Sequence, residues 1–516
     1  QGILLEDIDH YTSLNDISRF LLPIIGALCI LLFATITGYQ YSRTGIPFVL
    51  HRLKVAYGVI PLRNTINQFF GGILALASGF SVGKEGPAVH LGAACSGYIG
   101  NKLNLPSNSI RTLSACGVAA GIAACFNTPV AAVIFVMEVI LREYKVHMFI
   151  PIMLAAIIGS MMTSQVYGPA HEFEFFNSIS ISYSQYPWLV LLGVVLGALA
   201  SLFNRYLVLV VKHFQHIHIA KRFMLAGLIT GAIGYSIPQA MGTDLSAINF
   251  IMEDNAHLWL LIVLLFAKIA LTTAAIGLGV PGGIIGPILG IGAVAGAVMV
   301  SIISTDTSSI QMTSDFALMG MAGFMAATLN APLAALLAVV ELSNQLEVIV
   351  PAMLVISASC LASGQFFKNR SIFIMQLNMQ KLAYRKPPIE DSLHHIGALG
   401  VMQRNLSILD KQIFEEKTSN TLQLTHPNNH LIMRIRKDNE YHYFWHENAD
   451  TTDNEVDSIY DELKNGVNEK SHQYRQHQLH PLSSKDTLSE AYWALKEERC
   501  GAVYVYDKQI DNILGI

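Results

Sequence analysis

The chain has 516 residues, of which 52% are hydrophobic and only 14% are charged, and its formal net charge is −4. This composition is typical of a membrane protein and excludes a disordered or ordinary soluble chain. The small net charge gives no basis for nucleic-acid binding. The six cysteines form no Cys-x-x-Cys pair and no metal-ligand spacing, so neither a disulfide framework nor a metal centre is predicted.

The charged residues are unevenly distributed along the chain. Roughly half of them lie after about residue 381, in the last quarter of the sequence. We therefore predict a membrane domain over residues 1–380 and a polar domain over residues 381–516. The chain opens at Gln1 without a signal peptide and stops at Ile516 in a strand-like segment, so we expect residues of a longer protein to be missing at both ends.

The membrane domain contains apolar segments that are separated by glycine and proline breaks. Several are shorter than the roughly 20 residues that a simple membrane span needs. Broken helices are tolerated in membranes only where their ends are buried in protein or line a cavity. The expected segments are Phe20–Gly38, Thr65–Val82, Ala88–Gly100, Leu113–Leu141 with a break at Asn127–Pro129, Met148–Val166, Trp188–Val211, Phe223–Met241, Leu258–Leu278, Ile284–Ile303, Phe316–Val340 and Val348–Phe367.

The stretch Gly83–Pro87 places a charged pair, Lys84 and Glu85, between glycines and inside apolar sequence. Charges at membrane depth are costly and mark functional sites. Pro87 can occupy the first position of a helix, and the N-terminus of that helix would offer free N–H groups to an anion. Glu85 would be the protein's own anion at this site. The alternative is a tight turn between two helices, with its charges reaching the membrane surface.

An internal repeat links this stretch to the second half of the membrane domain. Gly83–Pro87 recurs as Gly283–Pro287, and Asn127–Ala132 recurs as Asn330–Ala335. Each asparagine run is followed by a glutamate, at Glu138 and Glu341. Interrupted segments at matching places in two halves predict a transporter-like fold with its site at the repeat interface.

We place the repeat halves at about residues 20–165 and 187–367. We expect them to be inverted, although the sequence does not fix their relative orientation. Three loops, Thr44–Pro47, Gly83–Pro87 and Gly283–Pro287, share glycines and a proline where a helix could begin. If the loops converge, backbone N–H groups would stabilise an anion without a fixed cation. This arrangement suits a conducted ion, because a central lysine or arginine would hold it too tightly.

The polar domain has the pattern of a small α/β module. His394–Asp410 is predicted as its entry, Leu431–Trp445 as a strand pair, and Asn448–Ser471 as an acidic linker. A helix over Leu488–Glu498 and strands at Gly501–Asp507 and Ile513–Ile516 complete it.

These motifs resemble the CLC family of chloride channels and chloride/proton antiporters over about residues 20–377. The family signature GSGIP corresponds to Arg43–Pro47. The signature G(K/R)EGP, followed by VH and GA, corresponds to Gly83–Pro87 with Val89-His90 and Gly92-Ala93. The signature GGIFAP corresponds to Gly282–Pro287. The polar domain resembles a pair of CBS modules, of which the second is cut short.

The resemblance implies a homodimer in a lipid bilayer, with one chloride pathway in each subunit. It implies that Glu85 is the gating glutamate, while we assign His90 a structural role. The anion-binding residues that it implies are Thr44, Gly45, Ile46, Lys84, Gly86, Ile284, Ile285 and Phe373. For Lys84, simple solvation is the alternative to a role in the local potential.

The sequence departs from the family pattern at four positions, three of them among these anion-binding residues. Antiporters of the family typically carry an internal glutamate at the position of Val139, and a valine cannot relay a proton. Thr44 replaces the central serine and keeps a hydroxyl group. Ile285 replaces an aromatic residue, and Phe373 replaces a tyrosine and has no hydroxyl group. An inner gate with these residues would be less constricted or less polar.

We therefore expect an all-α polytopic membrane protein with an internal repeat and broken helices, followed by a small α/β cytoplasmic CBS-like domain. The leading hypothesis is a selective chloride channel gated by Glu85. Proton-coupled chloride antiport without the usual internal glutamate is the alternative. A nucleotide-sensing regulatory protein with a membrane anchor is a further alternative.

No enzymatic role is expected, since no nucleophile–base pair is evident. No cofactor is expected, and an adenine nucleotide is the ligand considered for the CBS-like domain. We expect a multi-pass protein of a bacterial inner membrane or a plasma membrane. Chloride is the expected anion, with nitrate, bromide or fluoride as alternatives.

Overall fold

The computed structural model describes residues 11–38, 45–168, 181–243, 245–252, 257–303, 310–380, 382, 393, 396–410, 430–437, 440–446, 476–496, 502–507 and 512–516. Thr44 and the predicted linker Asn448–Ser471 lie outside these residues. The chain divides into two units, one made of Gln1–Leu103 with Ile110–Tyr384 and the other of Asn104–Ser109 with Arg385–Ile516.

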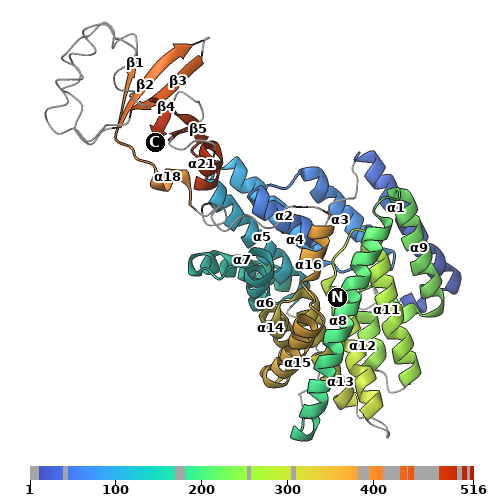
Figure 1. Cartoon of the computed structure of the whole chain (residues 1–516). Helices are drawn as coiled ribbons and strands as arrows, with labels where there is room; N and C mark the ends of the chain where they lie inside the picture. Colours follow the sequence, from blue (N-terminus) through green and yellow to red (C-terminus); the bar gives the residue numbers. More distant parts are fainter. Residues whose placement is uncertain are drawn as a thin grey trace, which may run out of the picture. The chain divides into compact units, whose positions relative to one another are not determined.

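The first unit is helical throughout its described residues (Figure 1). Its α-helices are α1 (Asp16–Ile36), α2 (Gly45–Val55), α3 (Leu62–Ala77), α4 (Glu85–Lys102), α5 (Ser107–Phe126), α6 (Pro129–Phe135), α7 (Val146–Tyr167), α8 (Tyr186–Phe214), α9 (Ile219–Ser236), α10 (Leu245–Met252), α11 (Leu258–Leu278), α12 (Ile285–Ile303), α13 (Ile310–Leu329), α14 (Pro332–Ser343), α15 (Ile349–Leu361) and α16 (Ile372–Met379). Short 3₁₀ or π segments are η1 (Tyr11–Ser13), η2 (Val136–Leu141), η3 (Tyr183–Gln185), η4 (Pro238–Ala240), η5 (Leu346–Val348) and η6 (Ala362–Phe366).

Within the described residues, 7 helices are long and apolar enough to cross a membrane. They are Asp16–Ile36, Ser107–Phe126, Val146–Tyr167, Tyr183–Phe214, Leu258–Leu278, Ile285–Ile303 and Leu346–Phe366. Two shorter apolar helices, Pro129–Leu141 and Pro332–Ser343, occupy matching places in the two halves. The prediction of many apolar segments, several of them short, is confirmed.

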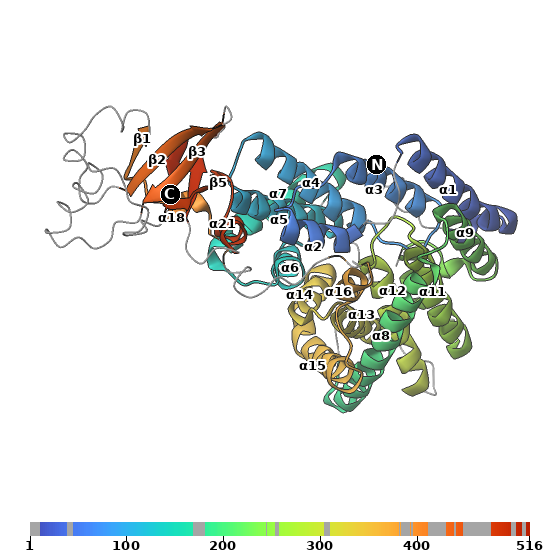
Figure 2. The ribbon, with the colours of Figure 1, turned by 45° about the horizontal axis from the view of Figure 1, so that its top comes forward.

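Helix α12 is enclosed by its neighbours, and 83% of its most apolar 18-residue stretch is buried. It packs against α13, which in turn packs against α8 and α15 (Figure 2). The two helices approach closely because glycines face each other: a Cβ atom on Gly292 would lie 2.5 Å from the carbonyl oxygen of Gly320. Small residues allow such contacts between membrane helices, where backbones approach without large side chains between them.

Three expected helix starts differ from the structure in the same way. Helices α2, α4 and α12 begin at Gly45, Glu85 and Ile285, so Pro47, Pro87 and Pro287 each occupy the third helical position, not the first. Proline is tolerated there because the first-turn N–H groups have no partner within the helix. The earlier start leaves two N–H groups ahead of each proline, and these groups have no acceptor within their own helix.

Two other expected segments end or break earlier than predicted. Phe316–Val340 is interrupted at Asn330, which has a left-handed backbone with φ 55°, as has its repeat partner Asn127. Asparagine adopts this conformation more readily than other residues with a side chain. Phe223–Met241 ends as an α-helix at Ser236, because Pro238 follows and opens a 3₁₀ turn.

The second unit contains two small sheets. The first has the strand order β1 (Leu406–Asp410), β2 (His430–Lys437), β3 (Glu440–His446) and β4 (Gln476–Gln478). The second has the order β5 (His480–Ser483), β6 (Val503–Tyr506) and β7 (Ile513–Gly515). The pairs β1–β2 and β5–β6 are parallel, and the others are antiparallel.

Two helices accompany these sheets, α18 (Ala398–Val401) and α21 (Leu488–Leu495). Helix α21 begins with a capping box. The Thr487 side chain accepts a hydrogen bond from the backbone N–H of Glu490, and the Glu490 side chain accepts one from the backbone N–H of Thr487. Burial raises the pKa of Asp486, directly before this cap. The predicted helix, strand pair and last two strands are therefore confirmed, with ends shifted by a few residues.

Candidate anion site

The two halves of the repeat meet at equivalent glycines. Gly83 and Gly283 form an antiparallel bridge: the Gly83 N–H donates to the Gly283 carbonyl at 2.9 Å, and the Gly283 N–H donates to the Gly83 carbonyl at 2.7 Å. Because equivalent residues exchange equivalent hydrogen bonds, a local two-fold axis relates these two glycines. The signature loops of both halves therefore lie at one place.

The Glu85 carboxylate occupies this place. Its Oε1 atom accepts a hydrogen bond of 2.5 Å from the N–H of Ile285, the first residue of α12, and the Glu85 residue is 0% exposed. A helix N-terminus favours a negative charge through its free N–H groups and its dipole. The carboxylate of α4 thus takes the position that α12 offers to an anion.

Glycine is required on both sides of this carboxylate. A Cβ atom on Gly83 would lie 1.9 Å from Glu85 Oε2, and one on Gly283 would lie 2.0 Å from Glu85 Oε1. Gly86 is also packed closely, because its Cβ atom would lie 2.5 Å from the Gly282 carbonyl oxygen. The glycines of the repeated motif therefore provide the space that the carboxylate fills.

A cavity of about 190 Å³ lies next to these loops. It brings together four residues singled out from the sequence, Gly45, Ile46, Ile284 and Phe373. The buried Phe373 side chain gives the cavity an apolar wall where a tyrosine would supply a hydroxyl group. The first and third loops therefore converge at this cavity, and the bridge joins the second loop to the third.

The remaining predicted residues lie elsewhere around the site. Lys84 is half-buried, and its Nζ atom lies 5.3 Å from the centre of the Phe126 ring. This contact is a cation–π interaction. The Ile285 side chain lies with Phe126 in a second, apolar cavity of about 30 Å³. Neither Lys84 nor Ile285 is among the described residues that line the larger cavity.

Gln68 was not identified from the sequence, although it contacts the first loop. This residue of α3 is 0% exposed, and its Oε1 atom accepts a hydrogen bond of 3.1 Å from the Gly45 N–H. Gly45 has φ +72°, a conformation that favours glycine. The available signal was a polar side chain within an apolar segment, which marks a functional position in a membrane helix.

Glu138 and Glu341 cap each other's repeat half. Glu138 accepts hydrogen bonds from the N–H groups of Leu333 at 3.3 Å and Ala334 at 2.7 Å, in the first turn of α14. Glu341 accepts the equivalent bonds from Val130 at 2.9 Å and Ala131 at 2.7 Å, in the first turn of α6. The interpretation of these glutamates as partners of helix ends is confirmed.

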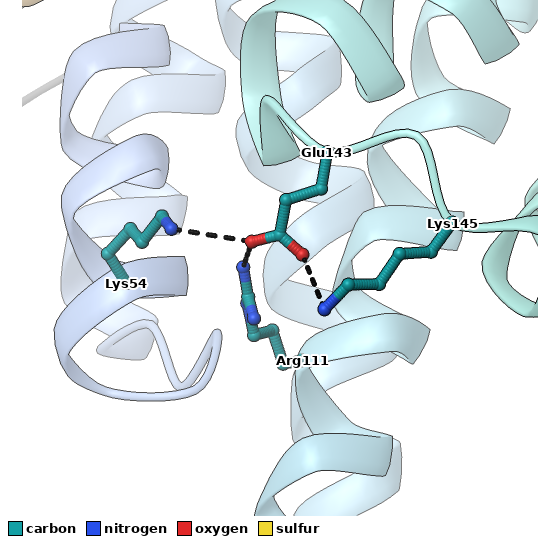
Figure 3. Close-up of polar contacts among 4 residues, drawn as sticks. All are labelled: Lys54, Arg111, Glu143 and Lys145. Carbon is teal, nitrogen blue, oxygen red and sulfur yellow. Dashed lines mark hydrogen bonds and ion pairs between the residues drawn. The ribbon is translucent and has the colours of Figure 1, made fainter. Parts of the chain in front are cut away.

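Val139, the position of the missing internal glutamate, is buried in the π segment η2. The nearby Glu143 is surrounded by three cations (Figure 3). Its carboxylate lies 3.5 Å from Lys54, 3.1 Å from Arg111 and 3.1 Å from Lys145. This ion cluster joins α2 and α5 to the segment after η2, and the three cations stabilise the carboxylate as an anion.

His90 is fully buried on α4 and stacks on Phe48, with ring centres 5.9 Å apart and planes inclined by 20°. Neither ring nitrogen has a hydrogen-bond partner among the described residues. His90 is therefore packed in the core without a hydrogen bond to the described residues.

The geometry defines a polytopic membrane protein in which broken helices from two repeated halves direct their N-termini to one site. The sequence profile of the voltage gated chloride channel family matches residues 24–364. The chain therefore belongs to this family, the CLC family, and is a multi-pass membrane protein of anion transport.

Several relatives of known name match most of this region. The H(+)/Cl(−) exchange transporter ClcA of Vibrio campbellii is 29% identical over 355 residues, covering 66% of this chain and 74% of the relative. A protein of Ralstonia nicotianae named for its likeness to the chloride channel protein ClcB is 28% identical over 351 residues, covering 65% of this chain and 80% of the relative.

Solved structures share the fold. That of a slow cyanobacterial Cl−/H+ antiporter has a TM-score of 0.63 at 21% identity and covers 72% of this chain and 88% of that chain. That of a eukaryotic CLC transporter has a TM-score of 0.59 at 19% identity and covers 97% of this chain and 90% of that chain.

Proposed function

We propose that this chain exchanges chloride for protons across a membrane and that Glu85 is the group that competes with the anion. One observation carries the proposal: the Glu85 carboxylate accepts the N–H of Ile285 at the start of α12, where a free anion would bind. Protonation removes the charge of the carboxylate and therefore its advantage over chloride. Proton uptake and anion entry are thereby linked at a single position.

Two relatives support exchange over the channel that the sequence favoured. ClcA of Vibrio campbellii is named an H(+)/Cl(−) exchange transporter, and so is ClcA of Vibrio parahaemolyticus, which is 30% identical over 301 residues. The sequence argument for a channel rested on Val139, which cannot carry a proton. Exchange requires that a water chain or another side chain takes over this inner step.

Passive conduction is the second candidate, and Val139 is the observation that favours it. The two functions differ in whether chloride flux moves protons. We would reconstitute the full chain in liposomes, impose a chloride gradient, and record chloride efflux and external pH together. Uphill proton movement driven by chloride supports exchange, whereas chloride flux without proton movement supports a channel and rejects exchange.

Glu85→Gln separates the role of the carboxylate from the rest of the site. The amide keeps the size of the side chain but cannot gain or lose a proton at physiological pH. In an exchanger this variant loses proton movement and retains chloride flux. In a channel it changes the pH dependence of the flux. If Glu85→Gln had the proton movement, chloride flux and pH dependence of the wild-type protein, Glu85 would have no part in either mechanism.

We further propose that the protein is a homodimer with inverted repeat halves and that the second unit is a cytoplasmic CBS-like domain. The antiparallel bridge between Gly83 and Gly283 supports inversion, because it reverses the chain direction between the halves. The parallel pairs β1–β2 and β5–β6 support a paired α/β module. Binding of ATP to the full chain, measured by calorimetry, would support nucleotide sensing, and no binding up to millimolar ATP would reject it.

A further inference from the structure

The cavity beside the signature loops has a single charged side chain among the described residues that line it, Arg222. Arg222 lies in the first turns of α9, which begins at Ile219. Around it the cavity wall contains the amide side chains of Gln215 and Gln376, together with the loop residues Gly45 and Ile284. The positive group therefore shares one space with the backbone of two signature loops.

The Arg222 guanidinium makes no hydrogen bond and no ion pair with the described residues, and its Nε atom is buried. A guanidinium carries five N–H donors and is charged at any physiological pH. Placing such a group in a partly buried wall without a counter-ion is unfavourable. A wall that faces an anion removes this cost, because the anion supplies both the opposite charge and the acceptor atoms.

We propose that Arg222 is the capture residue for the transported anion, a small monovalent ion such as chloride. This inference rests on the proposed function of chloride transport. The guanidinium raises the local anion concentration in the cavity and holds an arriving ion by hydrogen bonds. The anion site at Glu85 itself contains only neutral N–H donors. Arg222 therefore attracts the ion into the cavity, and the ion then moves to a site that has no fixed cation. Weak binding at that second site favours turnover, because the ion can leave again.

The sequence could not indicate this residue, because Lys221 and Arg222 are adjacent and both read as charges at the start of an apolar helix. The structure separates them: Lys221 is exposed, whereas Arg222 lines the cavity. Lys221 therefore provides a matched control, since its removal changes the net charge by the same amount at nearly the same place.

The experiment compares Arg222→Gln, Arg222→Lys and Lys221→Gln in liposomes by radioactive chloride tracer exchange. Chloride is kept equal on both sides, so the random orientation of the protein does not affect the result. Initial rates over a range of chloride concentrations give kcat and KM separately. Gluconate keeps the ionic strength constant in one series and raises it in a second.

We expect Arg222→Gln to raise the chloride KM by roughly five-fold with a smaller change in kcat, because removal of a focusing charge lowers anion capture. The difference should shrink at high ionic strength. Arg222→Lys should retain part of the effect, and Lys221→Gln should match the wild-type protein. An unchanged KM in Arg222→Gln, or an equal change in Lys221→Gln, would overturn the inference. Absence of chloride exchange in the wild-type protein would instead reject the proposed function.

Discussion

Gly83→Ala tests whether the Glu85 carboxylate occupies the anion position. The new Cβ atom would lie 1.9 Å from Glu85 Oε2, 2.4 Å from Oε1 and 2.5 Å from Cδ, and real Cβ contacts essentially never fall below 3.0 Å. All three atoms belong to the end of one flexible side chain. The backbone bridge to Gly283 is therefore preserved if the Glu85 side chain moves away.

The magnitude follows from the hydrogen bond that is lost. A hydrogen bond to a charged group contributes about 1.5–3 kcal/mol. Since about 1.4 kcal/mol is a factor of ten, the carboxylate should occupy the site roughly ten- to hundred-fold less often relative to chloride. We expect faster chloride tracer exchange in liposomes, with a weaker dependence on pH.

Two controls distinguish this displacement from general disruption. Gly364→Ala adds a Cβ atom that meets nothing within 4 Å, so it should leave exchange unchanged. In a Glu85→Ala background, Gly83→Ala should have no further effect, because the side chain that it displaces is absent. A folded Gly83→Ala protein with wild-type rate and pH dependence would refute the reasoning.

Three other substitutions test the packing around the site. Glu138→Gln should lower the free energy of unfolding by about 1 kcal/mol, because a neutral amide oxygen is a weaker acceptor for the α14 N–H groups. The measurement is the thermal unfolding midpoint in detergent, and an unchanged midpoint would contradict the capping role of Glu138. Gln68→Leu should alter chloride/nitrate selectivity in tracer competition, because the Gly45 N–H loses its acceptor. Asn67→Leu, at an equally buried position of α3, should leave the selectivity unchanged. Equal effects of the two substitutions would show that Gln68 acts only through packing. His90→Leu should leave the midpoint unchanged or higher, since no hydrogen bond is lost; loss of proton movement would instead assign the ring to proton transfer.

The repeat made much of the membrane unit predictable. Asn127 and Asn330 stand at equivalent places, and both break a helix with the same left-handed backbone. The sequence therefore indicated the break at Asn127, the matching glutamates and the convergence of the glycine loops, whereas the break at Asn330 was missed although the repeat pointed to it. The strand pair in the second unit was predictable for a different reason, because its alternation of side chains follows the period of a sheet.

The first residues of the helices, and the residues around the anion site that lie outside the motifs, were harder to predict from the sequence. Proline is compatible with several positions of the first helical turn, so Pro87 alone could not show that α4 begins at Glu85. Gln68 and Arg222 belong to no motif, and the residues that surround them come from other helices. Their importance appears only when α2, α3 and α9 are packed together.

The reciprocal capping by Glu138 and Glu341 has a consequence for biogenesis. During synthesis the first half emerges with α6 lacking its cap, because the acceptor is carried by a helix that has not yet been made. An uncapped helix end in the bilayer retains unsatisfied N–H groups, which are costly in the absence of water. The first half therefore reaches its final structure only after the second half has been inserted. Two separately expressed halves would each be incomplete, and co-expression should restore what neither fragment achieves by itself.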